Sequence, residues 1–162
     1  MKILLIPFGR IDSGVLEAIK NRVGSTFRTK VKVHSEEEIP ECERRGDQLN
    51  AEGFIPVIQK VIEREGFDLG LGVVDRDLYV EGLNFVFGIA YRNASVISLT
   101  RLKSGDKELF MRRAVKEAIH ELGHLFGLDH CENPKCVMHF SNCLKDTDIK
   151  SEGFCKGCER YV

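Results

Sequence analysis

One stretch of eleven residues constrains the fold and chemistry of this chain more than any other. Residues 120–130 follow the pattern HExxHxxGxxH, which contains three potential metal ligands, His120, His124 and His130. On a helix, residues i and i+4 leave from one face, so His120 and His124 can hold one metal ion. Gly127 can take the left-handed conformation that ends a helix, and the chain can then return His130 as a third ligand. The pattern therefore predicts a helix and a turn around a zinc ion.

The residue between the first two ligands gives this site a chemical role. Three protein ligands leave the fourth position of tetrahedral zinc open to water, as a catalytic site requires. Glu121 follows His120 directly, so its carboxylate can reach that water and act as a general base. We therefore predict a zinc-dependent hydrolase with Glu121 as the catalytic residue.

Four cysteines and a methionine after the motif narrow the assignment further. Cys131 follows the third histidine, Cys136 precedes Val137-Met138, and the pair Cys155 and Cys158 comes later. Together with the histidine motif, these residues resemble the archaemetzincins, a branch of the metzincin metalloproteases. The resemblance covers about the last third of the chain in motif detail.

The resemblance carries several expectations about structure. It implies a metzincin-like α/β fold with a mixed twisted sheet, an active-site helix beneath a cleft, a catalytic zinc and a second, structural zinc. Met138 stands where metzincins carry the methionine of their Met-turn, below the metal site. One strand between Leu83 and Leu99 would form the upper edge of the cleft, where a peptide substrate could pair by strand addition. Which strand forms that edge stays open.

The cysteine count supports a second metal independently of the resemblance. Six cysteines could form three disulfides, but only in an oxidising compartment. The apolar run in Met1–Arg10 is too short for a secretory signal and predicts a buried strand, so we expect a reducing, cytoplasmic location. In that setting Cys131 with Cys136, and Cys155 with Cys158, are two short-spaced pairs suited to a tetrahedral structural zinc. Redox disulfides and idle thiols are the alternatives.

Other residues compete for these roles. Cys42 and Cys143 remain outside the two pairs and are expected to be free thiols, although Cys143 could replace a ligand. In gluzincins the third zinc ligand is a downstream glutamate, for which Glu152 is the candidate here. His139 is a second rival, but it lacks the glycine-assisted turn that delivers His130. The expected cofactors are therefore two zinc ions per chain, one at the histidines and one at the cysteines.

Length and composition fit one compact domain over residues 1–162, with the four-cysteine site inside residues 131–158. The chain has 162 residues, of which 43% are hydrophobic, and can bury a sizeable core without disulfides. Its net charge of −1 and its lack of tryptophan give no electrostatic argument for nucleic acid or a membrane as partner. We expect a monomer whose partner is a peptide or protein substrate.

Hydrophobic periodicity predicts alternating strands and helices. Phe110, Ala114, Ala118 and Leu122 share one face of the motif helix, and Arg112, Arg113, Lys116 and Glu117 share another. Asp106 is the candidate N-cap of that helix. The mixed charge cluster Glu41–Arg45 is expected to be a solvated loop. The predicted strands are 2–7, 27–34, 69–74, 83–91 and 95–99, and the predicted helices are 15–23, 54–65 and 107–126.

Two function classes follow from these patterns. The first is a cytoplasmic zinc metalloprotease or peptidase whose substrate the sequence does not identify. The alternative is a zinc-stabilised peptide- or protein-binding module with little turnover. A zinc-ribbon-like tail that binds nucleic acid, with Lys145, Lys150, Lys156 and Arg160 near the cysteines, is disfavoured by the near-neutral charge. Endopeptidase and aminopeptidase activity are not distinguished, because no acidic group for an amino terminus can be placed in the cleft.

Overall fold

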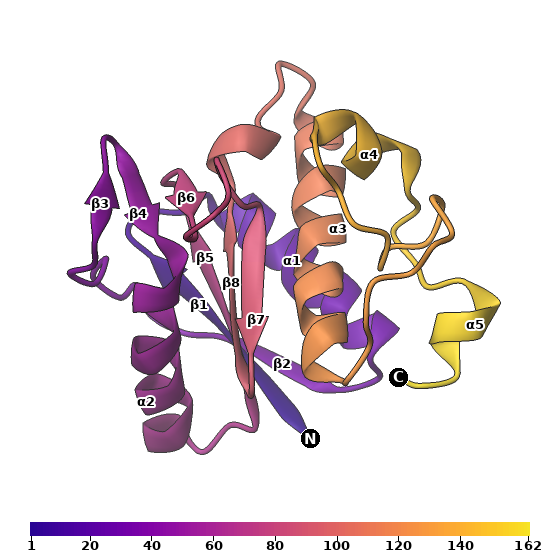
Figure 1. Cartoon of the computed structure of the whole chain (residues 1–162). Coiled ribbons are helices and arrows are strands. Elements are labelled where there is room, and N and C mark those ends of the chain that lie inside the picture. Colours follow the sequence, from indigo (N-terminus) through magenta and orange to yellow (C-terminus); the bar gives the residue numbers. More distant parts are fainter.

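A five-stranded mixed sheet forms the centre of the molecule. The computed structural model describes residues 1–162 (Figure 1). The strand order is β2-β1-β5-β8-β7; all neighbours are parallel except β7, which runs antiparallel to β8 and lies at the edge. This confirms the predicted α/β class with a mixed sheet. The strands are β1 (Lys2–Phe8), β2 (Lys30–Val33), β5 (Leu69–Val74), β7 (Gly88–Tyr91) and β8 (Ala94–Ser98).

Helices cover both faces of the sheet, which explains why its central strands are almost continuously apolar. In β1, Ile3 and Leu5 face α1 and α3, whereas Leu4 and Ile6 face α2, because successive side chains of a strand alternate. The two faces therefore build two hydrophobic cores, one between the sheet and α1 and α3 and one between the sheet and α2. The helices are α1 (Ser13–Thr26), α2 (Ile55–Glu65), α3 (Lys107–Leu125), α4 (Leu144–Ile149) and α5 (Lys156–Glu159), with short 3₁₀ turns η1 (Ala51–Phe54) and η2 (Thr100–Leu102).

Local signals account for several helix boundaries. Asp106 accepts hydrogen bonds from the backbone amides of Glu108 and Leu109, so the predicted N-cap of α3 is confirmed. Asp12 caps α1 in the same way, through the amides of Gly14 and Val15, and the helix therefore begins two residues earlier than predicted. None of the helices combines the length and hydrophobicity needed to cross a lipid bilayer.

Two predicted strands are shorter than the sequence suggested. The strand expected over 27–34 is regular only at Lys30–Val33, because α1 continues to Thr26 and Arg28 takes a left-handed conformation with φ of 50°. The strand expected over 83–91 is regular only at Gly88–Tyr91. The apolar residues before Gly88 belong to a loop instead.

A small second sheet lies beside the first and was not predicted. It consists of β3 (Arg44–Arg45), β4 (Gln48–Asn50) and β6 (Leu78–Tyr79), in the order β3-β4-β6. The expectation of a solvated loop over Glu41–Arg45 is therefore wrong at its end, since Arg44 and Arg45 pair with Leu49 and Gln48 in a hairpin.

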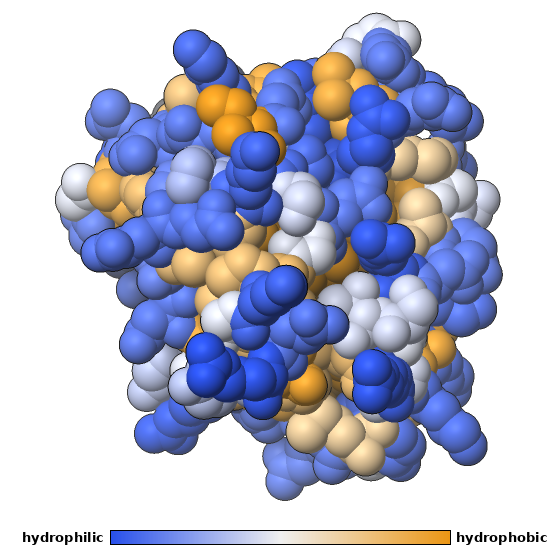
Figure 2. All heavy atoms as spheres, turned by 90° about the vertical axis from the view of Figure 1, so that its right-hand side faces the viewer, coloured by the Kyte–Doolittle hydropathy of each residue, from blue (hydrophilic) through white to orange (hydrophobic).

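The C-terminal segment covers the charged face of α3. Arg113 donates two hydrogen bonds of 2.8 Å to the carboxylate of Asp148, and Lys116 donates to the carbonyl of Thr147 at 3.1 Å. Arg113, Lys116 and Glu117 are therefore buried, although they form a polar helix face. The outer surface on this side of the molecule is mostly hydrophilic, with small separate hydrophobic patches (Figure 2).

Candidate metal centre and active site

The first two candidate ligands lie one turn apart near the end of α3. The Nε2 atoms of His120 and His124 are 3.1 Å apart. Two nitrogen atoms bound tetrahedrally to zinc at about 2.0–2.1 Å lie about 3.3 Å from each other, so this separation suits one shared ion.

A turn after the helix brings the third histidine to the same point. Gly127 has a φ of 90°, which a residue with a β-carbon rarely adopts, and the amide of Leu128 bonds back to the carbonyl of Gly123. The ring of His130 then lies 5.2 Å from that of His120 and 4.8 Å from that of His124. One ligand atom from each histidine lies within 4.8 Å of the others. The structure thus brings the three predicted ligands together.

Backbone carbonyls orient two of these rings. The Nδ1 atom of His120 lies 2.8 Å from the carbonyl oxygen of Val137, and that of His124 lies 2.7 Å from the carbonyl oxygen of Leu128. A carbonyl only accepts, so each Nδ1 carries the proton and each Nε2 keeps its lone pair for a metal. Outer hydrogen bonds of this kind are typical of metal-ligating histidines.

The protonation of the rings also favours metal binding. Burial lowers the pKa of His120 well below its usual value, and the nearby Lys150 lowers it further. Burial, followed by the neighbouring His124, lowers the pKa of His130. Both imidazoles are therefore neutral near pH 7, the form that binds zinc.

Glu121 lies between the helix and the edge strand β7. Its side chain is 5% exposed, and burial raises its pKa well above the usual carboxyl value, with a further contribution from Glu117. A β-carbon on Gly88 of β7 would stand 2.9 Å from Oε1 of Glu121, so only glycine gives the carboxylate room there. The side chain of Glu121 forms no hydrogen bond within the protein, so its carboxyl group stays available to a ligand in the cleft.

A cleft of about 630 Å³ opens above these side chains. Gly88, Ile89 and Ala90 of β7 line it on one side and the three histidines on the other, with Glu121 between. β7 is the last strand of the sheet, so one of its edges has no strand partner. Of the two strands between Leu83 and Leu99, β7 is therefore the one that borders the cleft. Further apolar lining comes from Val80, Leu83, Phe85, Val86, Phe87 and Phe140.

Met138 lies fully buried beside α3, as the resemblance implied for the methionine below the metal site. The alternative zinc ligands suggested by the sequence, His139 and Glu152, do not join the three histidines. His139 points its Nδ1 at the carbonyl oxygen of Cys131, 2.8 Å away, and is thus a neighbour of the site. Glu152 forms an ion pair with Arg22 at 3.5 Å.

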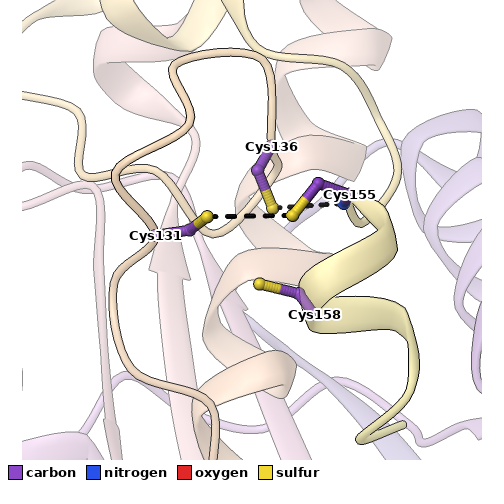
Figure 3. Close-up of side chains that lie close together, drawn as sticks. All are labelled: Cys131, Cys136, Cys155 and Cys158. Atoms are coloured by element: carbon purple, nitrogen blue, oxygen red, sulfur yellow. Dashed lines mark hydrogen bonds between the residues drawn. The ribbon is translucent and has the colours of Figure 1, made fainter.

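The four predicted cysteine ligands meet on the other side of the His130–Cys131 peptide. Their sulfur atoms lie within 4.8 Å of one another, and those of Cys131 and Cys155 are 3.8 Å apart. Sulfur atoms bound tetrahedrally to zinc at about 2.3 Å would be separated by about 3.8 Å. Figure 3 shows the four side chains pointing into one space, with Cys155 at the N-cap of α5 and Cys158 within that helix.

The environment of these thiols suits a cation. A hydrogen bond from the backbone of Cys158 lowers the pKa of Cys155 to about 7, and the amide of Cys155 also bonds to the sulfur of Cys136. Burial and the neighbouring thiols raise the pKa of Cys158, because several adjacent thiolates cannot form without a positive charge between them. A zinc ion would supply that charge. Cys42 and Cys143 lie outside the cluster and are free.

Sequence reasoning missed one charged residue beside the histidines. Lys150, which the sequence suggested only as part of a basic tail, is 1% exposed. Its Nζ lies 3.2 Å from the carbonyl oxygen of His139, 3.4 Å from Oε1 of Glu117 and 3.5 Å from Nδ1 of His120. No feature of the sequence distinguishes this lysine from its exposed neighbours.

Three imidazoles that meet at one point beside a buried carboxyl group, below a cleft that the edge of a sheet borders, define the class: a metallopeptidase. The sequence model of the family described as "Peptidase family M54" matches residues 58–162 of this chain. The chain belongs to this family, the archaemetzincins.

Relatives and solved structures agree over nearly the whole chain. An archaemetzincin from Pyrococcus furiosus is 43% identical, covering 99% of this chain and 91% of the relative; one from Saccharolobus solfataricus is 35% identical, covering 100% and 93%. The crystal structure of archaemetzincin from Archaeoglobus fulgidus, complexed with malonate, has a TM-score of 0.89 at 35% identity and covers 100% of both chains. The archaemetzincin structure from Methanopyrus kandleri has a TM-score of 0.87 at 37% identity, covering 99% of this chain and 92% of that one.

Proposed function

We propose that this protein is a zinc-dependent peptidase in which Glu121 is the general base and His120, His124 and His130 hold the catalytic zinc. The observation that carries the proposal is the position of Glu121, a buried carboxylate without a protein hydrogen-bond donor, next to a ligand histidine and facing the cleft. Zinc, when bound, lowers the pKa of water and polarises a carbonyl group.

The residues of the chain divide the remaining work. Glu121 takes the proton of the attacking water and holds it until the leaving amine accepts it. The free edge of β7 binds the substrate backbone by strand addition, which holds the peptide bond over the histidines.

The lining of the cleft favours a particular substrate chemistry. Its ionisable side chains other than the histidines are Glu117, Glu121 and Asp129, all acidic, and no lysine or arginine lines it. Acidic side chains in a substrate would be repelled, whereas apolar side chains can pack against the aromatic wall around Phe85 and Phe87. We therefore propose peptides with apolar residues near the scissile bond as substrates.

Cys131, Cys136, Cys155 and Cys158 would hold a second, structural zinc under this proposal. A cluster of four free thiols persists only where the surroundings are reducing, which supports a cytoplasmic location. The alternative function, a peptide-binding module with little turnover, keeps both zinc sites and differs only in whether bound peptide is cleaved.

Digestion of a peptide library by the zinc-loaded protein tests the proposal. Wild type should cleave peptides with apolar residues near the bond, and Glu121→Gln should lose about 10²–10⁴-fold in rate, because that is the usual contribution of a general base. The variant should retain its zinc, since Glu121 is not a ligand. Equal cleavage by both proteins would contradict the role of Glu121, and peptide binding without cleavage by wild type would favour the binding module.

A further inference from the structure

The loop between β6 and β7 forms much of the apolar wall of the cleft. We define residues 81–87 as the rim loop; Leu83, Asn84, Phe85, Val86 and Phe87 of this loop line the cleft. Its backbone is held by three hydrogen bonds, from Leu83 to the carbonyl of Val80, from Val86 to the carbonyl of Leu78 and from Ser98 of β8 to the carbonyl of Phe87. Leu83 is 46% exposed, so packing does not fix this side chain.

The β3–β4 hairpin contacts the rim loop from outside the cleft. Nη2 of Arg45 donates to the carbonyl oxygens of Leu83 and Asn84, each at 2.8 Å. Nε2 of Gln48 donates to the same Asn84 carbonyl at 2.8 Å. Two successive carbonyl groups of the loop are thus bound by three side-chain hydrogen bonds from two residues that do not line the cleft.

Arg45 is held in this orientation although it is exposed. Its Nε donates to Oε1 of Gln48 at 3.1 Å, and its guanidinium lies 4.2 Å from the ring centre of Tyr79. Gln48 in turn donates to Asp77 at 3.1 Å. A planar guanidinium fixed on both sides loses little further entropy when it binds a carbonyl, so these contacts are more effective than an isolated surface pair.

A second arginine supports the same loop farther along. Arg101 lies over the ring of Phe85, 4.1 Å from its centre, and binds both carboxylate oxygens of Asp77, at 2.8 and 2.9 Å. Asp77 therefore connects Arg101 to Gln48 behind the loop. The loop is held at its Leu83–Asn84 end by the hairpin and at Phe85 by Arg101.

We infer that Arg45 and Gln48 are positioning residues, which hold the rim loop at the height at which its apolar side chains meet a substrate. The part of this inference that concerns substrate rests on the proposed peptidase function. The part that concerns the loop does not.

Arg45→Met tests the inference, because methionine keeps an unbranched side chain over Tyr79 and removes the donors. Hydrogen exchange at the amides of Leu83 and Val86 should become about tenfold faster, as expected when a local opening becomes easier. KM for an apolar peptide should rise about five- to tenfold with kcat nearly unchanged, since neither the histidines nor Glu121 has moved. Arg45→Lys, which keeps the charge and a hydrogen-bond donor group, should raise the exchange rate and KM less than Arg45→Met does.

Arg44→Met is the matched control, because Arg44 is the exposed neighbour on the same strand and forms no side-chain hydrogen bond or ion pair. It should match wild type in exchange and in KM. Equal exchange at the rim loop in Arg45→Met and Arg44→Met would overturn the inference. Faster exchange with an unchanged KM would also overturn it, because the loop position would then not matter to substrate.

The exchange measurement separates this inference from the proposed function. If the wild-type protein hydrolysed no peptide, the proposed function would fail, while exchange would still report whether Arg45 holds the loop. Peptide affinity, measured by fluorescence titration in the Glu121→Gln background with and without Arg45→Met, would then replace KM. An affinity lowered about five- to tenfold supports the inference, and an unchanged affinity overturns it.

Discussion

The sulfur of Met138 lies against the α-carbon of Gly123, in the space that a β-carbon would occupy. Phe154 closes the same space from another side, 3.4 Å from that position. The residue before Met138, Val137, accepts the hydrogen bond that orients His120, and the carbonyl of Met138 accepts one from the amide of Cys131. Gly123 therefore allows α3 to approach the loop that supports both candidate metal sites.

Gly123→Ala should force Met138 and its loop away from α3. We expect a loss of about 1–3 kcal/mol in the free energy of unfolding, which is usual when a methyl group is added to a filled core. Zinc affinity at the histidines should also fall, because the carbonyl of Val137 moves with the loop. Urea denaturation and competition with a chromophoric chelator measure the two effects. Gly105→Ala is the control, since a β-carbon there meets no atom within 4 Å; equal behaviour of the two variants would disprove the packing argument.

Glu121 should destabilise the protein when its histidine site holds no metal. Burial raises its pKa in the folded protein above the usual carboxyl value of 4.5, so between pH 4.5 and the folded pKa folding takes up a proton and stability falls as pH rises. Glu121→Gln cannot ionise, and its stability advantage over wild type should be constant below pH 4.5 and grow above it, by up to about 1.4 kcal/mol per pH unit. The lowered pKa of His120 acts in both proteins and cancels from the difference. Urea denaturation from pH 4 to 8 measures this difference in the free energy of unfolding. Parallel curves of stability against pH for Glu121→Gln and wild type would contradict the raised pKa.

Metal content distinguishes the two sites. The ligand sets share no residue, so protein purified without chelator should contain about two zinc ions per chain by elemental analysis. The three-histidine site has neutral ligands and an open position, whereas four thiolates form a closed, anionic site. A chelator should therefore remove one zinc quickly and abolish peptide hydrolysis while the far-ultraviolet circular dichroism persists. A maximum of one zinc per chain would disprove the two-site arrangement.

Replacing a cysteine ligand should affect the distant histidines. Cys155→Ser removes one of four sulfur ligands, and the free energy of unfolding should fall by about 2 kcal/mol or more, because binding of a structural metal contributes to folding. The histidine site should bind zinc more weakly although none of its ligands has changed. Cys143→Ser is the matched control, since Cys143 is exposed and outside the cluster. Wild-type stability and zinc content in Cys155→Ser would show that the cysteines hold no structural metal.

The parts of the fold that follow local rules could be predicted from sequence. Periodicity and the Asp106 cap predict α3 to within one residue of its end, and the continuous apolar run Leu69–Val74 is β5 as expected. The ligand positions follow from helix geometry and one glycine. In contrast, the rim loop has the apolar composition of a strand, but only Phe87 of its apolar residues is buried in a core, whereas Leu83 is exposed at the cleft.

The missing parts depend on contacts between distant segments. Helical periodicity puts Arg113, Lys116 and Glu117 on a separate face of α3, but it does not reveal that Thr147 and Asp148 of α4 will cover this face. The burial of Lys150 has the same origin, since its partners lie more than ten residues away in sequence. The charged cluster around Arg45 has the composition of a solvated loop. It forms a hairpin because β4 pairs with β6, a strand that lies about thirty residues later in the sequence.

One peptide unit, His130–Cys131, joins the two candidate metal sites and has a thermodynamic consequence for metal exchange. With zinc at both sites, each ion fixes the backbone from which the other takes a ligand, so the two binding equilibria are coupled. Coupling of this kind is reciprocal: if the cysteine-bound ion raises the affinity of the histidines by some factor, the histidine-bound ion raises the affinity of the cysteines by the same factor. An ion at the histidines would therefore also tighten the binding of the ion at the cysteines, and a chelator that empties the histidine site first would leave the cysteine-bound ion held less tightly than in the doubly loaded protein.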